Sequence, residues 1–442
     1  MFKLPQTATA PFCPSEVKGS IAVPTGASFW ETLLRFAGPG LLVSVGYMDP
    51  GNWATDIEAG SRYGHGLLFV VLMSSLAAML LQCLCSRLGI VAQRDMARLC
   101  RERYRPGVNI VLWFLAEIAI IACDLAEVLG SALALHLLFG CSLTTGIAIT
   151  ALDTLLVLAL KGNGFRRVEA IILGLVLTIA ICFMFELFLV QPDWRAVLQG
   201  FVPHVATLQQ ESALYLAIGI LGATVMPHNL YLHSSIVQTR LVAQAAASKR
   251  LAIRMCKIDT IGSLALALLV NAAILILAAS AFHATGRHDV AAIEDAYLLL
   301  NPIVGSAMAA TIFGIALLAA GQSATFTGTI AGQVIMEGFL DLKIPCWQRR
   351  FITRGLALVP AFIGVALLGD GAVGKLLVLS QVVLSFQLPF AIYPLIRLTS
   401  DRKLMGEFSN GVLTKLFAWS IFAVISVANI WLLCATFGWT LS

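Results

Sequence analysis

The sequence predicts an all-α integral membrane protein in which two membrane-spanning helices are interrupted near their centres. Hydrophobic residues make up 59% of the 442-residue chain and charged residues only 12%, whereas soluble proteins carry about 25% charged residues. Apolar runs long enough to cross a bilayer recur along the whole chain. Two of these runs are broken by proline, at Asp49-Pro50 and at Met226-Pro227. Together these features exclude a soluble globular domain.

Eleven apolar segments are long enough to span a membrane, which takes about 20 residues. They cover approximately residues 38–60, 66–90, 108–138, 143–160, 168–190, 212–237, 258–283, 303–327, 351–369, 373–397 and 413–437. The loops between them are short, so we expect a single transmembrane domain over residues 38–442. Residues 1–37 begin without a sustained apolar run and are predicted to be a disordered cytoplasmic tail.

The basic residues indicate the orientation. With the N-terminus in the cytoplasm, 25 of the 29 lysines and arginines fall on the inner side, and only Arg62, Arg195, Arg287 and Lys375 fall on the outer side. The positive-inside rule therefore predicts a cytoplasmic N-terminus and, with eleven spans, an external C-terminus. The net charge of +5 reflects these loops and not a surface for nucleic acid. The ten cysteines form no CxxC pair and predict neither a disulfide framework nor a thiolate metal site.

The first interruption lies within the segment GPGLLVSVGYMDPGNWATDIEAG at residues 38–60. Proline removes a backbone donor and glycine loosens a helix, so the helix should break at Asp49-Pro50-Gly51-Asn52. Freed backbone at membrane depth is tolerated only where protein buries it or a cavity is lined by it. An aspartate at that depth marks a functional site by default. The structural alternative is a kinked helix with a buried, hydrogen-bonded Asp49.

The second interruption, in the sixth segment, predicts an inverted repeat. Five segments separate the start of one broken helix from the start of the other, and because five is odd the second set has inverted topology. Paired interruptions of this kind indicate a binding site between inverted repeats. The repeats would cover residues 38–190 and 212–397, with residues 413–437 as an additional helix.

The residues at the two interruptions offer a mixed set of metal ligands. Asp49 supplies an anionic oxygen, Asn52 an amide oxygen, and unwound backbone near Gly46 and Ala223 carbonyl oxygens. Oxygen ligands alone suit Mg²⁺ or Ca²⁺, whereas the thioether of Met226 shifts the preference toward transition metals. The alternative for Met226 is ordinary packing, the usual role of a methionine in an apolar helix.

The two interruptions also match a known family. DPGN at 49–52 together with MPHNLYLH at 226–233 resembles the NRAMP family of proton-coupled divalent-metal transporters, in particular its bacterial manganese-uptake branch. The resemblance extends over all eleven segments and includes GQSATFTGTIAGQVIMEGFL at 321–340 and SQVVLSFQLPF at 380–390. It implies a LeuT-type fold, with helices 1 and 6 broken and with alternating access.

The resemblance further implies a metal site at Asp49, Asn52, Met226 and the Ala223 carbonyl, joined by Gln381 in some states. The implied function is symport of Mn²⁺, and also of Fe²⁺, Cd²⁺ and Co²⁺, into the cytoplasm with protons. These ions would be transported substrates and not resident cofactors. The implied location is the inner (plasma) membrane of a bacterium, with no enzyme activity, nucleic acid or obligate protein partner.

Three carboxylates in the third segment need a separate role. Glu117, Asp124 and Glu127 are spaced by seven and three residues, which places them on one helical face. Carboxylates inside a bilayer need partners or protons, so this face is a candidate proton path, as in the resembled family. Candidate partners and further relay groups are Arg354, His228 and His233. The alternative is a structural salt-bridge network, above all for Glu117.

Two other functions compete with metal transport. A sodium-coupled amino-acid carrier would need a helix end that binds a carboxylate and no thioether beside an acid. An intramembrane hydrolase would need a nucleophile–base pair or a zinc motif such as HExxH, and neither is evident. The sequence assigns no role to Asp153, Asp56 or Glu58.

Overall fold

A computed structural model describes residues 18–22, 28–152, 165–203, 205–290, 292–304, 307–342, 346–369, 371 and 373–436. Its elements are β1 Ile21–Ala22, α1 Phe29–Phe36, α2 Pro39–Gly46, α3 Pro50–Tyr63, η1 Gly64–Leu67, α4 Leu68–Ala92, α5 Met96–Arg103, α6 Pro106–Phe139, α7 Leu143–Thr150, α9 Phe165–Val190, α10 Trp194–Gly200, α11 Val205–Leu208, α12 Glu211–Val225, α13 Pro227–Ile236, η2 Val237–Thr239, β2 Arg240–Leu241, α14 Ala246–Ala281, η3 His283–Thr285, α15 Ile293–Val304, α16 Ala307–Leu340, α17 Cys346–Leu368, α18 Val373–Ser400, α19 Arg402–Met405, η5 Gly406–Phe408 and α20 Val412–Thr436.

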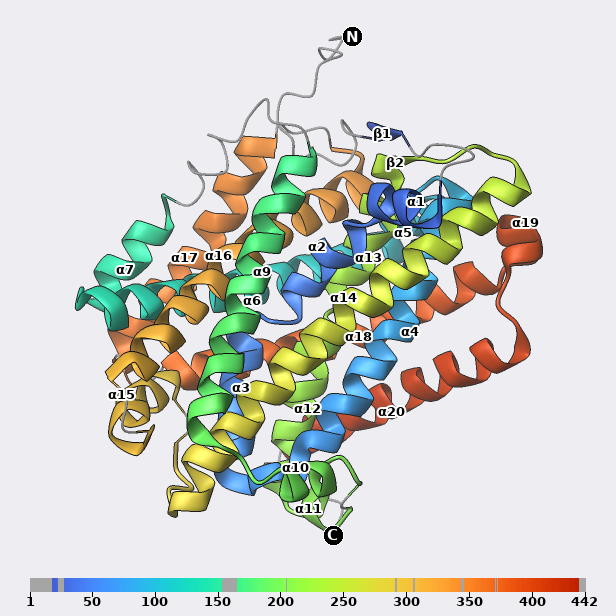
Figure 1. Ribbon diagram of the computed structural model, residues 1–442. Coiled ribbons are helices and arrows are strands. Elements are labelled where there is room, and N and C mark those ends of the chain that lie inside the picture. The colour runs from blue at the N-terminus through green and yellow to red at the C-terminus, as the bar shows by residue number, and fades with distance from the viewer. Residues whose placement is uncertain are drawn as a thin grey trace.

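Long helices cross the molecule from the end that carries the N-terminus to the opposite end (Figure 1). Helices α1, α5 and α19 lie at the N-terminal end with the two strands, whereas α10, α11 and α15 lie toward the opposite end (Figure 1). The strands form one short parallel ladder, in which Ile21 pairs with Arg240 and Ala22 with Leu241. Apart from these two short strands, the described elements are helices, which confirms the predicted helical fold. The strands join the chain before α1 to the chain after α13.

Eight stretches of the described chain are long and apolar enough to cross a membrane. The first, Pro50–Ala92, combines α3, η1 and α4, and α17 adds a shorter apolar helix at Arg354–Leu367. Each of the eleven predicted segments coincides with helix in the structure, in chain order α2 with α3, α4, α6, α7, α9, α12 with α13, α14, α16, α17, α18 and α20. The part of the fourth segment beyond residue 152, including Asp153, lies outside the described residues.

Several predicted boundaries differ from the structure; the seventh segment is predicted to begin at residue 258, but α14 already begins at Ala246. The eighth segment is predicted to cover residues 303–327, but α16 continues to Leu340. Its hydroxyl side chains bond back to their own helix, as Thr325 does to the Gly321 carbonyl at 2.9 Å, so a drop in hydropathy does not end the helix. Of the predicted tail at 1–37, residues 1–17 and 23–27 lie outside the described residues, and the described part contains β1 and α1. The motif Ser28-Phe29-Trp30-Glu31 begins α1 as a cap, with the Glu31 amide donating to the Ser28 hydroxyl at 3.3 Å.

Both predicted helix breaks are present. Helix α2 ends at Gly46 and α3 begins at Pro50, while α12 ends at Val225 and α13 begins at Pro227. Each proline occupies the first turn of the second half-helix, where a missing N–H removes no intrahelical hydrogen bond. The interruption therefore follows directly from the proline positions.

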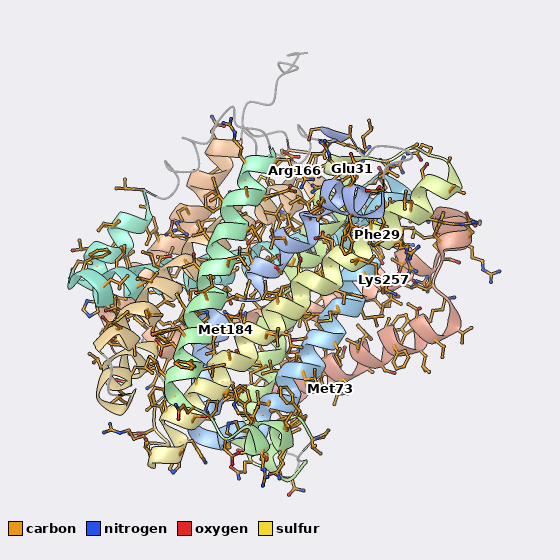
Figure 2. All side chains as sticks on the ribbon, viewed as in Figure 1. Phe29, Glu31, Met73, Arg166, Met184 and Lys257 are labelled. Carbon is orange, nitrogen blue, oxygen red and sulfur yellow. The ribbon has the colours of Figure 1, made fainter. Side chains whose placement is uncertain are left out.

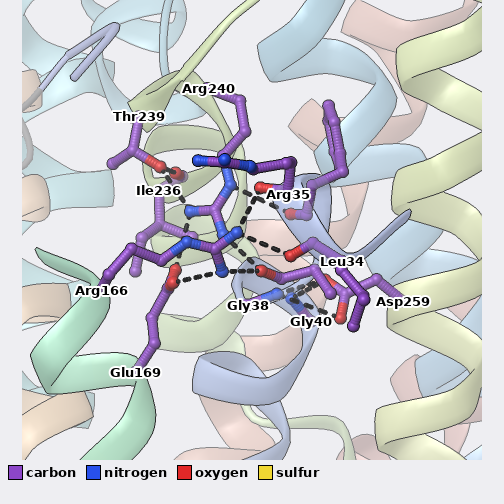
Figure 3. A network of polar contacts seen from close by, with 12 residues as sticks. Leu34, Arg35, Gly38, Gly40, Arg166, Glu169, Ile236, Thr239, Arg240 and Asp259 are labelled. Carbon is purple, nitrogen blue, oxygen red and sulfur yellow. Dashed lines mark hydrogen bonds and ion pairs between the residues drawn. The ribbon is translucent and has the colours of Figure 1, made fainter. Parts of the chain in front are cut away.

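A buried ion pair fixes the chain just before α2. Arg240 of β2 donates to the Glu169 carboxylate of α9 at 2.7 Å, and both side chains are almost fully buried. The same guanidinium donates to the carbonyls of Phe36 at 3.0 Å and Ala37 at 2.6 Å (Figure 3). Burial lowers the pKa of Arg240 from its ordinary value, and the Glu169 carboxylate opposes that shift.

A second arginine and an aspartate complete this junction (Figure 3). Arg166 of α9 donates to the carbonyls of Leu34 and Arg35, both at 2.6 Å, so the last carbonyls of α1 are bound by arginine. Asp259 of α14 accepts from the amides of Gly38 at 3.3 Å and Gly40 at 2.7 Å, which caps the start of α2. Gly38 has a φ of 136°, a conformation that suits glycine alone. The turn between α1 and α2 is thus held by side chains from α9, α14 and β2.

Close packing of α4 against α13 generates a stability prediction. A methyl group on Gly89 would collide with the Ser234 carbonyl oxygen, whereas one on Gly262 of α14 would meet nothing within 4 Å. Both replacements by alanine improve helix propensity by about 1 kcal/mol. We expect Gly89→Ala nevertheless to lower the midpoint of thermal unfolding, because overpacking costs about 1–3 kcal/mol. Unfolding of the purified protein, followed by size-exclusion chromatography after heating, checks this. The control Gly262→Ala should leave the midpoint unchanged or raise it; equal midpoints for both variants would contradict the described packing.

Candidate metal-binding site

Asp49 caps α3 in the interior of the molecule. Its side chain is fully buried, and its Oδ1 accepts from the Asn52 amide at 2.9 Å. Its Oδ2 has no hydrogen-bond partner among the described residues. A buried carboxylate oxygen without a partner carries a large desolvation cost unless a proton or cation approaches it. Asp49 therefore presents one oxygen that is satisfied by the helix and one that remains available.

Asn52 links the two broken helices. Its Nδ2 donates to Asp49 Oδ1 at 2.6 Å and to the Ala223 carbonyl of α12 at 3.2 Å. Its Oδ1 accepts from Asn271 of α14 at 3.4 Å. One amide group therefore sits between the carboxylate of the first break and the carbonyl of the second. Two acceptor oxygens are brought together around a single donor.

Met226 forms the second break itself. Its φ of 32° is unusual for a residue with a side chain, and its ψ is 105°. The side chain is fully buried, and its sulfur accepts from Asn229 Nδ2 at 3.6 Å. Gly46, at the end of α2, leaves the room for this approach, since a Cβ there would lie 3.3 Å from the sulfur and would collide with Asn229. The thioether thus lies in contact with the end of α2.

The carbonyls freed by the first break are satisfied by side chains. Asn271 donates to the Tyr47 carbonyl at 2.8 Å, and the Trp53 indole donates to the Met48 carbonyl at 3.1 Å. Asn271 of α14 and Trp53 of α3 thus satisfy backbone carbonyls that the break leaves open, as interrupted helices in membranes require. This leaves the unwound residues ordered and buried.

Gln381 of α18 lies on the other side of the break. A Cβ on Gly51 would collide with its side chain, and a Cβ on Gly222 with its backbone carbonyl. Its Nε2 donates to the Ser380 hydroxyl at 3.0 Å, and its Oε1 has no partner among the described residues. Gln381 therefore adjoins α3 and α12 at the level of the predicted ligands.

The predicted ligands do not form a cluster of titratable side chains. Within the described ranges, no group of three or more histidine, cysteine, aspartate or glutamate side chains is arranged to hold a metal ion. The predicted ligands here are one carboxylate, one amide, one carbonyl and one thioether. Such a set lies outside the usual histidine and cysteine clusters and suits a metal between hard and soft in character.

The carboxylates of α6 form a second polar group. Asp124 and Glu127 are buried in α6 and face Gly328 of α16, where a Cβ would lie 3.2 Å from Asp124 Oδ1 and 2.7 Å from Glu127 Oε1. The Cys123 thiol donates to Glu127 Oε1 at 3.4 Å and lies 3.6 Å from Nε2 of His228 in α13. The Cys123 thiol thus lies between Glu127 of α6 and a histidine two residues from the second break.

The other predicted relay residues are less closely grouped. Arg354 donates to the Thr150 carbonyl at 3.2 Å and lies within electrostatic range of Glu127. Glu117 is half-buried and accepts from the Trp113 indole at 3.1 Å. Seven residues along a helix correspond to about 10 Å, so Glu117 lies well away from Asp124. The structure therefore groups Asp124, Glu127 and His228, but not Glu117.

His233 belongs to a different chain of hydrogen bonds. Gln82 of α4 donates through Nε2 to the Tyr47 hydroxyl at 2.8 Å, which leaves its Oε1 to accept from His233 Nδ1 at 3.0 Å. Because the amide oxygen can only accept, Nδ1 of His233 carries the hydrogen. His233 Nε2 lies 3.9 Å from the Cys256 thiol. This chain connects the linker between α2 and α3 to the middle of α13.

Several contacts were not predicted from the sequence. Cys123, Asn229 and Asn271 each contact a predicted site residue, but no motif in the sequence assigns them a role. The available signal was a polar residue inside an apolar run, as for Asn271 in LLVNAAIL. Of the residues without an assigned role, Asp56 is buried in α3 with one oxygen unpaired among the described residues, and Glu58 pairs with Arg62 at 3.0 Å.

Comparison with known proteins identifies the family. The family model "Natural resistance-associated macrophage protein-like" matches residues 40–435. The "Divalent metal cation transporter MntH" of Ralstonia nicotianae is 68% identical over 429 residues, which cover 97% of each chain. The "Divalent metal cation transporter MntH 1" of Pseudomonas aeruginosa is 67% identical over 437 residues, 99% of this chain and 100% of the relative. These relatives are named as transporters and not as enzymes.

Solved structures of transporters are also similar to this chain. The crystal structure of a manganese transporter from Eremococcus coleocola superposes with a TM-score of 0.88 at 39% identity, covering 94% of this chain and 90% of that one. Mhp1, a nucleobase-cation-symport-1 family transporter, superposes with a TM-score of 0.61 at 13% identity over 97% of this chain and 90% of that one, which shows a shared fold alone. The chain has the predicted LeuT-type fold and is a transporter protein, not an enzyme; it belongs to the Nramp family.

Proposed function

We propose that this protein carries divalent transition-metal ions into the cytoplasm together with protons, by alternating access across a bacterial inner membrane. Mn²⁺ is the proposed principal substrate, with Fe²⁺, Cd²⁺ and Co²⁺ as further substrates. The names of the relatives support divalent-metal transport, and the solved manganese transporter supports Mn²⁺. The proposed orientation, with a cytoplasmic N-terminus and an external C-terminus, rests on the distribution of lysine and arginine.

One observation carries the proposal: a buried carboxylate oxygen, an amide and a carbonyl converge where two broken helices meet. Asn52 Nδ2 lies between Asp49 Oδ1 and the Ala223 carbonyl. A cation in this position would take over the role of the amide hydrogens and bind both oxygens. Rotation of the Asn52 amide would then direct Oδ1 toward the same ion. Asp49 Oδ2, unpaired among the described residues, would add the anionic charge.

Met226 sets the proposed chemical preference. Its sulfur adjoins Gly46 at the end of α2, where the unwound carbonyls of the first break begin. Hard cations such as Ca²⁺ and Mg²⁺ prefer oxygen ligands, whereas a thioether favours softer transition metals. Gln381 Oε1 is proposed as a ligand in a further state of the transport cycle, since it adjoins Gly51 but bonds none of the other ligands here.

The proposed proton path uses the second polar group. Asp124, Glu127 and His228 are buried; Cys123 links Glu127 to His228, and Asp124 lies beside Glu127 at Gly328. Side chains that exchange protons near neutral pH are needed for such a path, and buried carboxylates and histidines are suited to it. Arg354, Glu117 and His233 are proposed as outer members of the proton path. The positive charge of Arg354 interacts electrostatically with Glu127. The cation would avoid this row of carboxylates, which could otherwise trap it.

The test of the metal site is Asp49→Asn. This substitution keeps the acceptor for the Asn52 amide but removes the negative charge, so we expect Mn²⁺ binding to fall to background while the protein still folds. Isothermal titration calorimetry and Mn²⁺ uptake into proteoliposomes measure the effect. Asp295→Asn, on an exposed carboxylate of α15, is the matched control. Normal uptake by Asp49→Asn would remove Asp49 from the site.

The test of selectivity is Met226→Leu. Leucine nearly preserves the volume of methionine but lacks the sulfur, so packing is retained. We expect the affinity for Cd²⁺ to decrease more than that for Mn²⁺, and Ca²⁺ or Mg²⁺ to compete more effectively. Competition against Mn²⁺ uptake gives the order. Met255→Leu, in the buried cluster between α14 and α1, is the control; if both variants keep the original order, the sulfur of Met226 has only a packing role.

The test of the proton path is Asp124→Asn. We expect metal affinity to be kept, because Asp49 and its partners are unchanged, while metal-stimulated proton influx into liposomes loaded with a pH dye is largely lost. Calorimetry supplies the affinity from the same preparation. Glu211→Gln, on an exposed carboxylate at the start of α12, serves as control.

Two results would contradict this assignment. Loss of metal affinity together with proton flux would make Asp124 part of the metal site. Unchanged proton flux would exclude Asp124 from the proton path.

A further inference from the structure

Helix α1 presents three different faces along only eight residues. Leu33 and Phe36 pack into a cluster with Ile90 of α4 and Met255 of α14. Trp30 and Leu34, one turn apart on a second face, are 70% and 71% exposed. The exposed charged residues Glu31 and Arg35 form the third face. A helix with one face on the protein, one apolar face exposed and one charged face has the pattern of a helix at a membrane surface.

The position of α1 agrees with this pattern. Figure 2 shows Glu31 at the end of the molecule that carries the N-terminus, Phe29 closer to the middle and Lys257 of α14 closer still. Met184, which is 68% exposed, lies near the middle, and Met73, which is 57% exposed, lies beyond it toward the opposite end (Figure 2). Exposed apolar side chains on the helices of a membrane protein face lipid. Helix α1 therefore lies where the lipid-facing surface meets the water.

Basic side chains of α14 lie beside α1. The guanidinium carbon of Arg254 lies 6.0 Å from the centre of the Phe29 ring. Lys257 follows Arg254 after one helical turn, and both side chains are exposed. Exposed Ile258 continues the apolar surface on the same helix. An aromatic residue with basic side chains at this boundary combines an apolar surface with attraction for anionic headgroups.

Helix α1 is also firmly joined to the transporter core. Its last carbonyls accept from Arg166 and Arg240, and only Ala37 and Gly38 separate it from α2 (Figure 3). The exposed face is therefore carried on a rigidly held helix and not on a loose tail. The protein leaves Trp30 70% exposed on this firmly held helix, and a large exposed apolar side chain of this kind indicates an interaction surface.

We propose that α1 is a membrane-surface anchor that binds anionic phospholipid. Trp30 and Leu34 lie at the boundary between headgroups and acyl chains, and the phosphate of an anionic lipid lies against Arg254 and Lys257. The chemistry that this surface recognises is a phosphate attached to an apolar chain, because the basic and apolar side chains adjoin each other. Glu31 and Arg35 remain in water. Lipid binding at α1 then acts directly on the segment that leads into α2.

The first experiment locates Trp30. The chain contains eight tryptophans, so the signal of Trp30 is the difference between the unmodified protein and Trp30→Phe. In vesicles of phosphatidylcholine and phosphatidylglycerol, we expect this difference to be quenched by lipids brominated near the top of their acyl chains and not by aqueous iodide. Trp194→Phe, on exposed α10 at the opposite end, gives the same comparison for a tryptophan outside the proposed anchor.

Two outcomes would overturn the location. Quenching of Trp30 by iodide alone would mean that the exposed face of α1 lies in water and not in the membrane. Protection from both quenchers would mean that protein, either a second copy or another partner, covers this face.

The second experiment measures the lipid. Native mass spectrometry of the full chain counts the phosphatidylglycerol retained by the Arg254→Gln/Lys257→Gln variant. We expect affinity for this lipid to fall about tenfold to thirtyfold, the effect of removing two basic residues near an anionic surface, and excess inorganic phosphate not to displace it. The control is Arg402→Gln/Lys403→Gln, an exposed basic pair at the same end, in α19.

The control should retain lipid as the unmodified protein does. Equal loss of phosphatidylglycerol from both double variants would mean that any basic pair at this end attracts the lipid by its charge. That result would overturn the proposed site. Unchanged retention in Arg254→Gln/Lys257→Gln, or displacement by inorganic phosphate, would overturn it as well.

Discussion

The structure depends on one constraint: backbone groups freed in the middle of a membrane must find partners within the protein. Proline and glycine open the helix between Gly46 and Pro50. Asn271 and the Trp53 indole donate to the carbonyls of Tyr47 and Met48. The side chains that surround the break are therefore polar because the backbone requires it, and the proposed cation site lies in the same place.

This constraint explains why the two breaks face each other. Each break leaves backbone carbonyl oxygens without helical partners and gives the backbone an unusual geometry. Neither break can therefore face lipid. Asn52 of the first break donates to the Ala223 carbonyl of the second, and Asn229 beside the second break donates to the Val43 carbonyl of α2 at 3.5 Å. Each broken helix therefore satisfies part of the other. A single broken helix would need a partner of another kind, which is why paired interruptions in a sequence predict a site so strongly.

The fold could be predicted because its signals are local. Apolar length predicts the spans, and Pro50 and Pro227 predict the breaks. Asp49, Asn52 and Met226 were identifiable because they lie directly at those breaks. Asn271 and Cys123 were not, because each is one polar residue in a long apolar run, and only the packing of α14 on α3 and of α6 on α13 shows what it contacts.

The remaining differences have the same origin. The length of α16 was underestimated because hydroxyl groups such as that of Thr325 bond to their own helix and are compatible with its continuation. Helix α1 was missed because its eight residues are too short for a spanning signal. Its amphipathic character becomes clear only when the protein-facing and exposed sides are distinguished, as for Phe36 and Trp30.

Helix α2 is the element on which these contacts converge. Its eight residues correspond to about 12 Å, and no continuous helix joins it to α1 or α3. Side chains hold it at both ends: Asp259 accepts from Gly38 and Gly40 at its start, while Asn229 lies against Gly46 at its end. The hydrogen bonds at its start are buried, so they resist rearrangement unless new partners replace them, whereas a helix continuous with α3 would have to bend. A short helix held in this way can change position as a unit. The proposed alternating access therefore requires little distortion of α2 itself, and the resistance to its movement resides in the polar contacts at its two ends.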